Sequence, residues 1–145
     1  MALSVQLGTK MQLSYAKANL AGALLAMGEP GTTVPLCQEA IHLAEEAGDR
    51  FGKVLALRTL AEAVFCLDPT DRQGAERAML DAIRIQQEIG AKPELARSYM
   101  SYARLLKAWG KSEPAKEHLS QAIGMFRAMG MAWDLERAEQ ALREA

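Results

Sequence analysis

The stretch that decides the fold of this 145-residue chain is PELARSYMSYARLLKAWGKSEPAKEHLSQAIGMFRAMG, which runs from Pro93 to Gly130. Its first half places large apolar residues four, three, four and three positions apart, which is the spacing of one face of an α-helix. Its second half does the same, after a tight turn at residues 109–112. The stretch therefore predicts a helical hairpin, with the two apolar stripes at Leu95, Tyr99, Tyr102, Leu106 and Trp109 and at Ala115, Leu119, Ala122, Ile123 and Phe126.

Two earlier stretches repeat this pattern in the same register. Glycines that suit the left-handed end of a helix recur 40, 42 and 40 residues apart, at Gly8, Gly48, Gly90 and Gly130. Thirteen residues after each of the first three glycines comes a small residue, and seven residues later a turn former: Ala21 with Gly28, Ala61 with Asp68, and Ala103 with Gly110. A recurring unit of this length indicates a helical repeat protein.

Alanines also recur in the second helix of each unit, so we expect them to face the alanines of the first helix and to allow close helix packing. The expected pairs are Ala21 with Ala40, Ala61 with Ala82, and Ala103 with Ala122. No stretch alternates apolar and polar residues as a strand would. The sequence therefore predicts an all-α solenoid of three antiparallel hairpins with partial flanking helices.

The repeat register divides the chain as one repeat domain, 1–145. Residues 1–8 match the end of a second helix whose first helix is missing. The three hairpins are 9–48, 49–90 and 91–130, and residues 131–145 form a C-terminal capping helix. Because the chain starts inside a repeat, we expect it to be a fragment of a longer protein or to self-associate through an exposed N-terminal edge.

Composition excludes several classes of function. The formal net charge is -1 and aromatic residues make up only 6% of the chain, so a nucleic-acid partner is not expected. No apolar run is long enough to span a bilayer and residues 1–13 do not resemble a signal peptide, so we expect a cytoplasmic protein with no membrane partner. The two cysteines, Cys37 and Cys66, lack metal or redox spacing and are expected to be small buried residues.

No motif in the chain predicts catalysis, a metal or a cofactor. Gly110-Lys111-Ser112 matches the end of a phosphate-binding loop, but Leu105 stands where that loop needs a glycine, so an ordinary turn is expected. His42 and His118 lie in different repeats without partners at ligand spacing, and interhelix or surface packing explains them better. Thr70 with Gln73 predicts a capping box at the start of a helix.

The repeating residues resemble those of the tetratricopeptide repeat (TPR) family over nearly the whole chain. The resemblance rests on a large residue followed by a small one in each first helix, on the turn glycines Gly28 and Gly110, and on the alanines of the second helices. It implies a right-handed superhelix of hairpins. A period of 40 to 42 instead of 34 is similar to the long repeats of bacterial signalling ATPases, maltose-regulator-type activators and nucleotide cyclases.

In the TPR family the first helix of each hairpin lines a concave face that binds partners. The resemblance implies that this face carries Tyr15, Asn19, Gly22, Arg58, Glu62, Phe65, Arg97, Met100, Arg104 and Lys107. We therefore expect a non-catalytic protein-interaction or regulatory module that binds a peptide or a partner helix in this groove. The alternatives are a small-molecule or peptide sensor that controls an attached enzyme, and an oligomerisation element.

Overall fold

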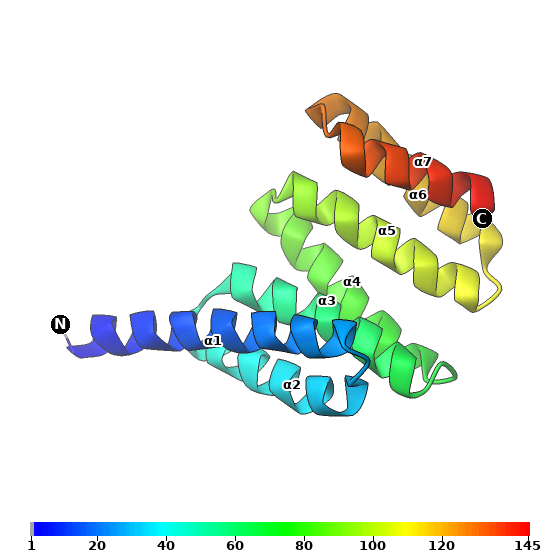
Figure 1. Ribbon diagram of the computed structural model, residues 1–145. Helices are drawn as coiled ribbons and strands as arrows, with labels where there is room; N and C mark the ends of the chain where they lie inside the picture. Colours follow the sequence, from blue (N-terminus) through cyan, green and yellow to red (C-terminus); the bar gives the residue numbers. More distant parts are fainter. Residues whose placement is uncertain (1) are drawn as a thin grey trace. The chain divides into compact units, whose positions relative to one another are not determined.

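The computed structural model describes the backbone of residues 2–145 and the side chains of residues 8–145. Within residues 2–145 every regular element is an α-helix, which confirms the predicted all-α class (Figure 1). The helices are α1 (Ala2–Ala26), α2 (Pro30–Ala47), α3 (Arg50–Leu67), α4 (Arg72–Ile89), α5 (Lys92–Ala108), α6 (Ser112–Met129) and α7 (Ala132–Glu144).

Most of the predicted turn glycines lie where a helix ends. Gly28, Gly48, Gly90, Gly110 and Gly130 all have positive φ angles, between 68° and 82°. The Gly48 and Gly130 amides donate to carbonyl oxygens of the preceding helix turn, which satisfies groups that a helix end leaves without partners. Residues 109–111 form the turn between α5 and α6, close to the predicted turn at 109–112, and Ser112 already begins α6. This segment is an ordinary turn between two helices and not a phosphate-binding loop.

The helix end predicted at Gly8 is wrong. α1 runs without a break from Ala2 to Ala26, and Gly8 is not among the glycines with positive φ. A glycine inside a helix costs only about 1 kcal/mol relative to alanine, and good helix formers on both sides of Gly8 outweigh that cost. The boundary predicted between residues 8 and 9 therefore falls within a helix, and residues 2–8 belong to α1.

The chain divides into two compact units, Met1–Ile85 and Gln86–Ala145, with the division inside α4. The repeat boundaries derived from the sequence stay a prediction.

In the first unit α1 packs against α2 and α3, and α2 also packs against α3. One buried alanine from each helix, Ala18, Ala40 and Ala56, forms a cluster at their meeting point. Beside it the Ser14 hydroxyl on α1 donates a 2.9 Å hydrogen bond to the Ala40 carbonyl oxygen on α2. Small side chains let these backbones approach closely. The alanine of α1 in this cluster is Ala18, whereas the sequence pattern predicts Ala21 as the partner of Ala40; Ala21 is also buried.

Aspartates cap the N-termini of α3 and α4. The Asp49 side chain accepts a 3.1 Å hydrogen bond from the Gly52 amide at the start of α3. Asp71 accepts an equivalent 3.1 Å bond from the Gly74 amide at the start of α4. The capping box predicted at Thr70 is therefore wrong by one residue: the Thr70 hydroxyl instead bonds to the Asp68 carboxylate within the turn. An aspartate accepts at the N-cap as well as a threonine does, and here it comes one residue later.

In the second unit α6 packs between α5 and α7 and buries Phe126 completely. His118 of α6 lies against two rings of α5, with ring centroids 5.5 Å from Tyr99 and 4.9 Å from Tyr102. This confirms that His118 serves interhelix packing. Ala103 and Ala122 are both buried, as expected for the alanines of this hairpin.

The two cysteines differ in environment. Cys37 on α2 is fully buried, as predicted, and burial raises the pKa of its thiol to about 11. Cys66, near the end of α3, is exposed, so the prediction of a second buried cysteine is wrong. The apolar run around Cys66 indicates a helix but does not determine which side of that helix is covered.

Candidate functional site: the groove between α5 and α7

The residues predicted to line a concave face fall into two groups, one in each unit. Tyr15 and Asn19 lie on α1, and Arg58, Glu62 and Phe65 lie on α3. The second group, on α5, comprises Arg97, Met100, Arg104 and Lys107.

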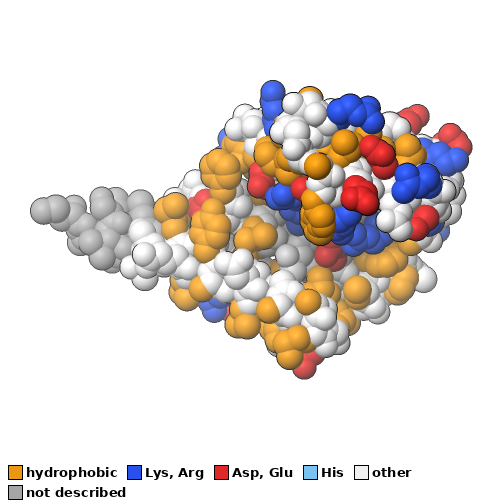
Figure 2. Space-filling view, turned by 45° about the horizontal axis from the view of Figure 1, so that its top comes forward, with side chains coloured by type: hydrophobic (Ala, Val, Ile, Leu, Met, Phe, Trp, Pro, Cys, Tyr) orange, Lys and Arg blue, Asp and Glu red, His pale blue; other side chains and the backbone are white. Residues whose placement is uncertain are grey.

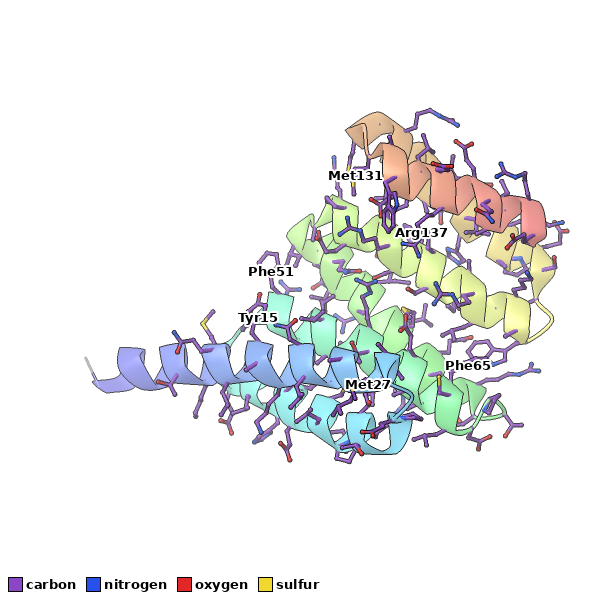
Figure 3. The ribbon with its side chains drawn as sticks, viewed as in Figure 1. Tyr15, Met27, Phe51, Phe65, Met131 and Arg137 are labelled. Atoms are coloured by element: carbon purple, nitrogen blue, oxygen red, sulfur yellow. The ribbon has the colours of Figure 1, made fainter. Side chains whose placement is uncertain are left out.

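The group on α1 and α3 is spread along the two helices. In Figure 3 Tyr15 and Phe51 are both drawn toward the start of α3, while Phe65 lies toward the opposite end of that helix. Tyr15 is 38% exposed, and partial burial together with the nearby Asp49 carboxylate raises the pKa of its phenol. Arg58, Glu62 and Phe65 are each half-buried. These residues offer a mixed surface, but they do not converge on one point.

The group on α5 is more concentrated. Met100, Arg104 and Lys107 line one cavity of about 150 Å³, to which α6 and α7 also contribute residues. The name α5–α7 groove is used here for the complete lining of this cavity, which consists of Met100, Ala103, Arg104, Lys107, Leu119, Ala141, Glu144 and Ala145. Three of the four predicted α5 residues are thus brought together.

Arg97, the fourth predicted residue, is held in an ion pair. Its Nε lies 3.2 Å from Oδ1 of Asp134 on α7, and its Nη2 lies 3.5 Å from Oδ2 of the same carboxylate. Nη1 of Arg97 also lies 3.8 Å from Oε1 of Glu94, which is on the preceding turn of α5. Asp134 is buried, so this two-point pair joins α7 to α5. Arg97 therefore holds α7, which forms one side of the groove, against α5.

The side chains that line the α5–α7 groove include two cations, Arg104 and Lys107, and one anion, Glu144. Arg104 and Lys107 are both exposed, and neither forms an ion pair with any side chain in the described range 8–145. The Glu144 carboxylate accepts a hydrogen bond from Gln140. Leu119, Ala103 and Met100 add apolar surface beside the two cations. Figure 2 shows Lys and Arg side chains gathered next to apolar ones over the helices of this unit.

Sequence reasoning missed the residues that α7 contributes. Ala141 and Glu144 line the groove because α7 packs beside α6 in the position of another first helix. The sequence aligns residues 133–144 with a first helix, but they were expected to cap the last hairpin and not to line a binding surface. A signal was present: α7 follows Gly130 at the same interval as α5 follows Gly90. A shift of 40 residues moves Arg104 onto Glu144.

A second cavity lies between α5 and α6 and was not predicted. Its volume is about 650 Å³, and it is lined by Lys92, Leu95, Tyr99, Ser120, Gln121, Gly124, Met125, Ala128 and Met129. The Tyr99 hydroxyl at this cavity accepts a 3.0 Å hydrogen bond from Gln87. Most of the lining is apolar, with methionines that can adapt to different shapes.

No group of three or more His, Cys, Asp or Glu side chains in the described part of the chain is arranged to hold a metal ion. None of its helices combines the length and the apolar character needed to cross a membrane.

Comparison with known proteins supports the fold. No family model matches the chain, and no curated protein matches it in sequence. Among solved structures, the TPR domain of Arabidopsis FLU is similar, with a TM-score of 0.73 and 18% sequence identity over 82% of this chain and 98% of that domain. Together with the helix order and the glycine-ended turns, this likeness shows that the chain has a tetratricopeptide-repeat-like fold.

Proposed function

We propose that this protein is a non-catalytic interaction module whose α5–α7 groove binds an acidic segment of a partner protein, as a peptide or a helix. The observation that carries the proposal is the presence of two cations without ion pairs, Arg104 and Lys107, beside an apolar floor. Guanidinium and ammonium groups bind carboxylates through charge-assisted hydrogen bonds. The apolar floor offers a place for a neighbouring aliphatic side chain.

The size and composition of the groove support a peptide more than a small molecule. A cavity of about 150 Å³ is smaller than the roughly 300–1,000 Å³ typical of small-molecule sites, but it suits a side chain of a longer ligand. The lining contains no serine, cysteine or histidine, so it offers none of the nucleophile–base pairs that are built from these side chains. We place the module in a larger bacterial signalling protein because of the resemblance of its long repeats.

The test is selection of ligands from a displayed peptide library, followed by calorimetric titration of the selected peptides. Arg104→Glu with Lys107→Glu should weaken binding at least about tenfold, since each charge-assisted bond contributes about 1.5–3 kcal/mol. The matched control is Arg72→Glu with Arg77→Glu, which makes the same charge change on exposed residues of α4. Equal binding by both double variants would exclude the α5–α7 groove as the site.

The second cavity supports the alternative of a small-molecule sensor, because its volume of about 650 Å³ lies within the usual range for such ligands. Gly124 borders this cavity and has open space where a side chain would project. A ligand whose binding is lost on Gly124→Leu, and retained in the Arg104 and Lys107 variants, would favour the sensor.

A further inference from the structure

α1 carries an apolar stripe on a face that its unit leaves uncovered. The stripe consists of Leu13, Ala16, Leu20, Ala23 and Met27, and it is called the α1 stripe below. All five residues are exposed, the three large ones by 45%, 52% and 73%. Their spacing of three, four, three and four is that of the seam between two packed helices. Met27 directly follows the last residue of α1, and Figure 3 shows it at the C-terminal end of this helix.

Corresponding helices in the chain have a second helix of the preceding hairpin packed against them. α2 packs on α3 in this way, and α6 packs on α7. α1 contacts α2 and α3 through its opposite side, where Ser14, Ala18 and Ala21 are buried. α1 therefore has apolar residues on both sides, of which one side is covered within the unit.

We propose that the α1 stripe is a self-association surface, on which α1 of a second copy of this chain packs antiparallel. The stripe is self-complementary about Leu20. With a two-fold axis at that residue, Leu13 of one copy lies opposite Met27 of the other, and Leu20 meets Leu20. Ala16 then leaves room for the larger Leu24, and Ala23 leaves room for the aliphatic part of Lys17. This matching of large and small side chains favours a second copy over an unrelated helix.

The charges of α1 also permit this pairing. Residues 1–28 contain no aspartate or glutamate. The two lysines of α1 each pair with α2 of the same chain, Lys10 with Glu46 and Lys17 with Glu39, both at 2.8 Å. The positions that flank the stripe on its other side, Gln12 and Asn19, are uncharged. Two copies can therefore approach without bringing unpaired like charges together.

The expected dimer is weak. The α1 stripe extends only about 21 Å along the helix, from the rise of 1.5 Å per residue. A single helix seam of this length is smaller than a standard protein interface, which covers about 800 Å² on each partner. We expect association that depends on concentration and is visible in the micromolar range.

The test is sedimentation velocity of the whole chain at about 1 to 300 µM, with circular dichroism to verify folding. Wild type should shift from monomer to dimer with concentration. Leu20→Glu and Leu20→Lys should each weaken association by more than about a hundredfold, because like charges would meet at the axis. An equimolar mixture of the two variants should dimerise again. Leu67→Glu is the matched control, since Leu67 is 53% exposed against 52% for Leu20, and it should dimerise like wild type.

Two results would overturn the proposal. One is a wild-type chain that stays monomeric over the whole concentration range. The other is a Leu20→Glu variant that associates as wild type does. If each single variant is monomeric and their equimolar mixture is also monomeric, the two-fold arrangement about Leu20 is wrong. The readout is independent of the α5–α7 groove, so failure here leaves the proposed function standing.

Discussion

Gly52 is a position where only a hydrogen atom fits as the side chain. A Cβ there would lie 2.5 Å from Oδ2 of Asp49 and 3.2 Å from Oγ of Ser14. Asp49 cannot move away easily, because it is buried and caps α3. Gly74 occupies the same place relative to its cap, Asp71, but that aspartate is exposed and a Cβ would lie 2.9 Å from its Oδ2.

We therefore predict that the same substitution, glycine to alanine, has different effects on stability at these two positions. Gly52→Ala should lower the free energy of unfolding by about 1–3 kcal/mol through overpacking. Gly74→Ala should leave it unchanged or raise it by up to about 1 kcal/mol, since alanine favours the helix and the exposed cap can shift. Urea denaturation of both variants measures the difference, and equal losses would show that the buried cap is not responsible.

Cys37 and Cys66 should react very differently with a thiol reagent at pH 8. Cys37 is buried and its pKa is raised to about 11, so very little reactive thiolate is present in the folded chain, whereas Cys66 is exposed. One thiol should react rapidly, and Cys66→Ser should remove that phase. Two rapid phases in wild type would contradict the burial of Cys37.

The same raised pKa predicts a stability change in alkali. Folding favours the protonated thiol, so the stabilisation is complete below the ordinary pKa of 9.0 and is lost as the pH rises through about 11. Between the ordinary pKa of 9.0 and a pH of about 11, the free energy of unfolding of wild type should fall by up to about 2–3 kcal/mol relative to that of Cys37→Ala. This corresponds to about 1.4 kcal/mol for each pH unit, and denaturation at a series of pH values measures it.

At the scale of elements, α7 depends on its ion pair with α5. Asp134→Asn should destabilise the chain by about 1–2 kcal/mol, because it removes one partner of a partly buried pair. Hydrogen exchange should rise first in α7. The control is Glu139→Gln on the same helix, which removes an exposed 3.6 Å pair with Arg127 and should cost less than about 0.5 kcal/mol. Similar costs for the two variants would mean that the Arg97 pair does not anchor α7.

Elements were more predictable than their ends. The three- and four-residue spacing of apolar side chains places a helix correctly even where packing is unknown, as in α5 and α6. Gly8 shows the limit, because a glycine is compatible with both a helix end and a helix interior, and the neighbouring residues decide. The cap of α4 shows the same ambiguity between Thr70 and Asp71.

At the scale of the whole molecule, the fold class could be predicted because the pattern recurs. Within each unit the packed helices are neighbours or next neighbours in the chain, so sequence order indicates which helices meet. The groove was only partly predictable. Met100, Arg104 and Lys107 follow from their place on a first helix, but the engagement of Arg97 by Asp134 depends on a distance between helices that no sequence spacing states.

The many buried alanines between the packed helices have a thermodynamic consequence. Alanines make up half of the buried apolar side chains in the described range. An alanine side chain has no rotamers to lose on folding, whereas a buried leucine or methionine loses about 0.5–2 kcal/mol of rotational freedom. Much of this interior is therefore ordered at almost no cost in side-chain entropy, so the entropy lost on folding is mainly that of the backbone.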